Sequence, residues 1–139
     1  MNKEKDTQLI QLPKISDPRG NLSFIEGGQH IPFEIKRVFY IYDVPTAVSR
    51  GAHAHKDCHQ FLTCLTGGLD VHTDDGHGSK RITHLNKPWE GLHIPPMTWA
   101  SEEDFDSGTV YLVLTSRFYN AEDYIRDYNE FLSIARSES

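Results

Sequence analysis

The chain has 139 residues, a length that fits a single domain with a buried core, and we expect one domain over 1–139. Its 37% hydrophobic and 24% charged residues are typical of a soluble globular protein. The net charge of −6 argues against a general nucleic-acid binder, because such proteins gather positive charge against phosphates. No apolar run approaches a membrane span and the charged N-terminus lacks the apolar core of a signal peptide, so we expect a cytoplasmic protein.

Short apolar or alternating runs separated by turn signals dominate the chain. The turns include the sequences DPRG at 17–20, GG at 67–68 and DSG at 106–108. Several short strands separated by such turns indicate an all-β barrel or sandwich. The expected strands cover 22–26, 37–42, 61–65, 69–73, 81–85 and 109–116.

The most informative segment is RGAHAHK at 50–56. On a strand, His53 and His55 point to one face because side chains alternate. Gly51 permits close approach of a backbone or ligand, and Arg50 could hold an anionic group. His59 extends the pattern to His-x-His-x3-His, which could bind a divalent metal. The alternative is that these histidines are exposed polar residues of a strand without a functional role.

Two cysteines follow in the same region. Cys58 and Cys64 match no zinc-binding spacing and are too few for a disulfide framework. We interpret both as reduced thiols, one of them on a core-facing strand position.

The C-terminal segment has a helical period. We predict a helix over 121–136 that packs on the barrel, capped by Asn120 and with acidic residues in its first turn. Its apolar face would comprise Tyr124, Tyr128, Phe131, Leu132 and Ala135.

Two segments resemble the cupin motifs. GAHAH at 51–55, with the turn at 67–68, resembles the first motif, although His59 stands where that motif has a glutamate. The segment 89–97 resembles the second motif, and Ala100 then stands where the last histidine ligand would be. The second motif has therefore lost its metal-binding residue.

A more specific resemblance covers nearly the whole chain. The segments 17–22, 31–40, 50–56 and 123–128 are similar to those of the dTDP-sugar 3,4-ketoisomerases. The resemblance implies a double-stranded antiparallel β-barrel of the cupin or jelly-roll type with one C-terminal α-helix. It also implies a homodimer with exchanged N-terminal strands, and conversion of dTDP-4-keto-6-deoxy-D-glucose to a 3-keto sugar without a metal or cofactor. Products of such enzymes feed amino-sugar synthesis for surface polysaccharides.

The resemblance also implies roles for particular residues. His53 and His55 would act jointly as base and proton shuttle through an enediol, and Tyr40 is a candidate hydroxyl donor. Ala100 cannot donate a proton where relatives carry a polar residue that sets the C4 configuration, so the galacto or gluco product stays open. The residues expected to bind the diphosphate, the sugar or the thymine are Arg19, Arg37, Arg50, Phe39 and Trp99.

Two other readings stay open from the sequence. One is a metal-dependent cupin oxygenase or isomerase that uses His53, His55 and His59. The other is a non-catalytic cupin that binds a nucleotide sugar.

Overall fold

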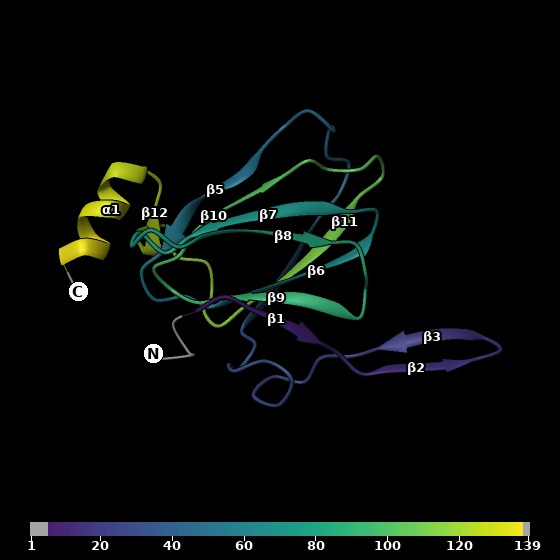
Figure 1. Ribbon diagram of the computed structural model, residues 1–139. Helices are drawn as coiled ribbons and strands as arrows, with labels where there is room; N and C mark the ends of the chain where they lie inside the picture. The colour runs from purple at the N-terminus through teal and green to yellow at the C-terminus, as the bar shows by residue number, and fades with distance from the viewer. Residues whose placement is uncertain (1–5, 138–139) are drawn as a thin grey trace.

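The computed structural model describes residues 6–137, which form two five-stranded antiparallel sheets and a separate hairpin (Figure 1). The first sheet has the spatial order β1 (Gln8–Gln11), β9 (Glu90–Ile94), β6 (Gln60–Thr66), β11 (Val110–Thr115) and β4 (Arg37–Ile41). The second has the order β12 (Tyr124–Ile125), β5 (Arg50–His55), β10 (Trp99–Glu103), β7 (Leu69–Asp74) and β8 (Lys80–Leu85). The hairpin pairs β2 (Lys14–Asp17) with β3 (Gly20–Ser23).

The main core lies between the two sheets. Leu62 and Val113 from the first sheet belong to the same buried cluster as Val71 and Leu85 from the second. Burial of these side chains is the main force that holds the sheets together. The prediction of an all-β jelly roll with a C-terminal α-helix is confirmed.

Several strands follow the alternation expected of half-buried sheets. In β4, Arg37, Phe39 and Ile41 are half-buried, whereas Val38 and Tyr40 are exposed. The central strand β6 is instead buried from Gln60 to Cys64. Both cysteines are buried and free, and Cys64 takes the core-facing strand position that we predicted.

The predicted helix over 121–136 is wrong at its N-terminal end. Ala121–Asp123 form a 3-10 helix capped by Asn120, and Tyr124–Ile125 form β12, which pairs with His55 and Ala54 of β5. The α-helix α1 covers only Tyr128–Ser137, and its residue Phe131 is fully buried. Pairing with β5 takes the backbone groups that a longer helix would have used.

The β2–β3 hairpin extends away from the two sheets (Figure 1). All eight of its strand residues are exposed, including the apolar side chains of Ile15 and Leu22. In the described part of the chain, no helix has the length and apolar character needed to span a membrane.

Candidate active site

A cavity of about 330 Å³ lies between the sheets, at the end of the sandwich where β12 pairs with β5. Its wall includes inward-facing residues of β4 and β6 on one side and of β5 and β10 on the other. The polar and charged lining residues are Arg37, Arg50, His53, Gln60, Glu102, Tyr124 and Arg126. The cavity therefore holds several titratable groups inside an otherwise apolar sandwich.

The two histidines of β5 lie together, as their spacing predicts. The ring centroids of His53 and His55 are 5.1 Å apart in an edge-to-face arrangement. His53 lines the cavity, whereas His55 is buried and packs against the ring of Tyr124 at 4.4 Å. His53 is therefore the histidine that a bound molecule would meet.

Burial keeps both imidazoles neutral. Desolvation, with help from the charges of His55 and Arg126, lowers the pKa of His53 to about 4. Desolvation also lowers the pKa of His55, although the hydrogen bond and charge of Asp123 oppose that shift. A neutral imidazole can accept a proton, so His53 is in the form that a general base requires.

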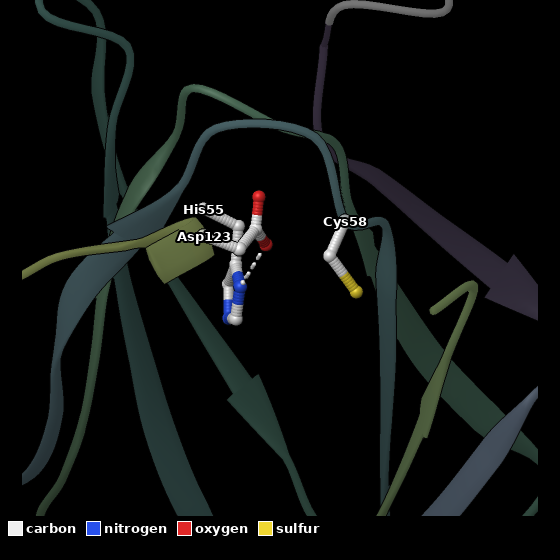
Figure 2. Close-up of side chains that lie close together, drawn as sticks. All are labelled: His55, Cys58 and Asp123. Carbon is white, nitrogen blue, oxygen red and sulfur yellow. Dashed lines mark hydrogen bonds and ion pairs between the residues drawn. The ribbon is translucent and has the colours of Figure 1, made fainter. Parts of the chain in front are cut away.

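Asp123 fixes the orientation of His55 (Figure 2). Its Oδ2 lies 2.9 Å from Nδ1 of His55, and its Oδ1 accepts a hydrogen bond of 2.8 Å from the backbone N–H of Asp57. Because a carboxylate only accepts, Nδ1 of His55 carries the hydrogen and Nε2 is the acceptor. Within residues 6–137, that buried Nε2 has no hydrogen-bond partner.

Metal binding by His53, His55 and His59 is not supported by their placement. Nδ1 of His59 lies 2.9 Å from Nε2 of His93, and the two rings stack. Among the described residues, a different set brings its ligand atoms within 4.8 Å of one another at this end of the sandwich, namely His55, Cys58 and Asp123 (Figure 2). Nitrogen, thiolate and carboxylate donors suit Zn²⁺, but an ion there would compete with the His55–Asp123 hydrogen bond.

Guanidinium groups give the cavity a positive wall. Arg37 lies over the rings of Phe39 and Tyr119, at 4.6 and 5.1 Å from their centroids. Arg126 lies 4.4 Å from the ring centroid of Tyr124, and Arg50 faces the cavity from β5. Such a cluster suits an anion such as a diphosphate.

Three predicted site residues lie away from this cavity. Tyr40 points to the opposite face of β4, where it is 62% exposed and stacks on Tyr42. Trp99 packs against the rings of Tyr128 and Phe131 beside α1. Arg19 pairs with Asp17 at the hairpin turn, with its side chain 90% exposed.

Four residues at or beside the cavity were not among the predicted site residues. Asp123, Tyr124 and Arg126 fall within the predicted helix, although they also lie in the family-like segment 123–128. Glu102 gave no signal in the sequence, and its carboxyl group lies in the cavity wall. Tyr124 lines the cavity and is in ring contact with both histidines, whereas Tyr40, the tyrosine expected there, is not in the cavity wall.

The chain matches a protein family and a known relative along most of its length. Residues 5–136 match the protein family described as "FdtA: WxcM-like, C-terminal". The chain is 44% identical over 126 residues to a TDP-4-oxo-6-deoxy-alpha-D-glucose-3,4-oxoisomerase from Aneurinibacillus thermoaerophilus, and the match covers 91% of this chain and 90% of the relative.

The chain is also similar in sequence and structure to solved sugar 3,4-ketoisomerases. The 3,4-ketoisomerase QdtA of Thermoanaerobacterium thermosaccharolyticum in complex with TDP is 41% identical, with a TM-score of 0.91 over 95% of this chain and 96% of that one. A mutant of QdtA in complex with TDP-4-keto-6-deoxyglucose is 39% identical, with a TM-score of 0.92 over 99% and 97%. The TDP-quinovose 3,4-ketoisomerase WlaRB of Campylobacter jejuni is 42% identical, with a TM-score of 0.89 over 93% and 98%.

Proposed function

The chain belongs to the FdtA family, and we propose that it is an isomerase that converts dTDP-4-keto-6-deoxy-D-glucose into a dTDP-3-keto-6-deoxyhexose. The relatives named above are 3,4-ketoisomerases that act on sugars, and a mutant of one of them, QdtA, has been solved in complex with TDP-4-keto-6-deoxyglucose. The observation that carries the proposal is a neutral histidine, His53, inside a cavity walled by guanidinium groups.

His53 is the base in this proposal. Moving the ketone from C4 to C3 requires removal of the C3 proton, an enediol and delivery of a proton to C4. His53 lines the cavity, so its imidazole is the one that can reach the sugar. The negative charge of a bound diphosphate would raise the pKa of His53 from about 4 toward neutrality and strengthen it as a base.

His55 and Asp123 support His53 from behind. The Asp123 carboxylate holds His55 in one tautomer and stabilises positive charge on its ring. The edge-to-face contact between the two rings then fixes the orientation of His53. His55 and Asp123 are therefore positioning residues in this proposal, and the shuttle role of His55 stays a prediction.

The arginines bind the anionic part of the substrate. Arg37, Arg50 and Arg126 are rigid donors that match the oxygens of a diphosphate. Phe39 lies in the same wall, under the guanidinium of Arg37, where a planar base could stack beside it.

A homodimer would give the hairpin and Arg19 a function. Ile15 and Leu22 on the hairpin are exposed, as are Val38 and Tyr40 on the edge strand β4, and burying apolar side chains stabilises an interface. In a dimer that exchanges N-terminal strands, Arg19 would leave its own subunit and reach the partner's cavity. We therefore assign Arg19 to the substrate site of the second subunit.

We place the enzyme in the cytoplasm, in deoxysugar synthesis for surface polysaccharides, because its proposed substrate is a sugar nucleotide. The direct test incubates the purified protein with dTDP-4-keto-6-deoxy-D-glucose and follows the sugar by NMR. We expect the C4 ketone to be replaced by a C3 ketone, and the coupling at the new C4 hydrogen identifies the galacto or gluco product. An unchanged substrate would refute the proposed function.

A further inference from the structure

Glu102 is an ionisable side chain of the cavity that the steps above do not use. It lies on β10 two residues after Ala100, and the two side chains share the face that lines the cavity. The hydroxyl of Tyr111, a fully buried residue of β11, donates a hydrogen bond of 3.2 Å to Oε1 of Glu102. The carboxyl group is therefore held in one place against the cavity.

Gly51 makes room for this carboxyl group. A Cβ atom at Gly51 would lie 2.2 Å from Oε2 of Glu102 and 2.9 Å from Oε1, closer than a Cβ atom lies to a non-bonded atom. Gly51 also has a φ of +81°, a conformation that favours glycine. The strand with the two histidines thus carries a gap, and the Glu102 carboxyl group fills it.

The surroundings leave Glu102 able to hold or release a proton near neutrality. Its pKa is raised to about 7, with burial as the largest cause. The charge of Glu103 also raises this pKa, whereas the Tyr111 hydrogen bond and the charge of Arg50 lower it. These groups come from β11, β5 and β10 itself, and the β7 residue paired with Glu102 is the apolar Val71. Both protonation states of Glu102 are therefore accessible at pH 7.

A 3,4-keto shift needs two proton transfers at oxygen besides the two at carbon. One proton must reach O4 as the C4 ketone becomes an enol, and one must leave O3 as the C3 ketone forms. These two oxygens are neighbours in the planar enediol, at a spacing that the two oxygens of one carboxyl group can span. The proton transfers between the histidine and the carbons C3 and C4 do not supply these two proton transfers at oxygen.

We propose that Glu102 is the group that exchanges protons with the sugar oxygens, and this inference rests on the proposed function. The protonated carboxyl group donates to O4 while His53 removes the C3 proton. The resulting carboxylate then accepts the O3 proton while the histidine returns its proton to C4. The net change moves one proton from C3 to C4 and one from O3 to O4, and Glu102 ends in its starting acid form.

The test compares Glu102→Gln with the wild type on dTDP-4-keto-6-deoxy-D-glucose, with Glu103→Gln as the matched control. The Glu102→Gln side chain keeps the shape and can still accept from Tyr111, but it cannot transfer a proton. We expect kcat to fall roughly 10²-fold or more with KM little changed, because general acid–base groups contribute about 10²–10⁴-fold. Glu103 bonds the Ser101 hydroxyl outside the cavity lining, so Glu103→Gln should keep near wild-type turnover.

The pH profile separates proton transfer from a structural role. The acid form of Glu102 starts the reaction, so wild-type kcat/KM should fall as pH rises through about 7, and Glu102→Gln should lack this limb. Tyr111→Phe removes a bond that lowers the pKa of Glu102, so it should move the limb to higher pH.

Two outcomes separate the role of Glu102 from the proposed function. A wild type that converts the sugar, with a Glu102→Gln variant that keeps its turnover or the alkaline limb, would overturn the role of Glu102 alone. A wild type that leaves the sugar unchanged would overturn the proposed function and, with it, the role of Glu102.

Discussion

Replacing Asp123 by Asn tests whether the carboxylate behind His55 matters for turnover. The bond between Asp123 Oδ2 and His55 Nδ1 is 2.9 Å long, and the two side chains are only 14% and 7% exposed. A hydrogen bond to a charged group contributes roughly 1.5–3 kcal/mol, and the amide introduced by Asp123→Asn would supply only a neutral bond. A neutral hydrogen bond contributes about 1 kcal/mol, so the difference is roughly 0.5–2 kcal/mol. If that difference acts on the transition state, kcat should fall about 2- to 30-fold.

The assay measures kcat and KM separately, by NMR of the sugar. KM should stay within about twofold of wild type, because Asp123 does not line the cavity wall that holds the substrate. A second readout is the tautomer of His55, followed by ¹⁵N-detected NMR of the imidazole. We expect hydrogen on Nδ1 in the wild type and a change in that state in Asp123→Asn.

The matched control is Asp57→Asn. The Asp57 carboxylate is largely exposed and pairs with Arg117, while its backbone N–H still reaches Asp123 in the variant. This control should retain wild-type kcat. A kcat within twofold of wild type for Asp123→Asn, with Nδ1 of His55 still protonated, would show that the reasoning about positioning is wrong.

Three further predictions concern the base, acid stability and the dimer. His53→Asn should fold and bind substrate but lose roughly 10²–10⁴-fold in kcat, and near-normal turnover would remove His53 as the base. Burial lowers the pKa of His53 and His93 from 6.5 to about 4, so between these pH values the folded state binds fewer protons than the unfolded state. The free energy of unfolding in urea should therefore decline as pH falls from about 6.5 to about 4. A free energy of unfolding that does not change over this pH range would contradict the prediction. Mixed dimers of Arg19→Ala and His53→Asn subunits should regain part of the wild-type turnover. In such a dimer one cavity combines an intact His53 with an intact Arg19 from the partner. If no turnover is recovered, Arg19 does not act in the partner's site.

Local patterns in the sequence were enough to predict the histidine pair and the strands β4, β6, β7, β8 and β11. The expected ranges did not include β1, β2, β9, β10 and β12. The apolar runs of β4 and β11 and the two-residue spacing of His53 and His55 depend on neighbours along the chain, which a sequence displays directly. The four family-like segments also predicted Arg37, Arg50 and Phe39, which do line the cavity.

The missed residues depend on contacts between distant parts of the chain. Tyr124 fits a helical period, yet its backbone pairs with β5, which brings it to both histidines. Asp123 meets His55 across 68 positions, and Glu102 enters the cavity only because β10 pairs with β5 beside Gly51. Tyr40 shows the reverse error, since one position along β4 turns a side chain from the cavity to the outer face.

The most direct measurement of the central claim runs the wild-type enzyme with dTDP-4-keto-6-deoxy-D-glucose in D₂O and analyses the product by NMR and mass spectrometry. His53 lines the cavity, so we expect a proton that it takes from C3 to exchange with solvent before it is returned to C4. We expect a 3-keto sugar with deuterium at C4. Recovery of the unchanged substrate, or of a product that keeps the original C3 hydrogen at C4, would contradict it.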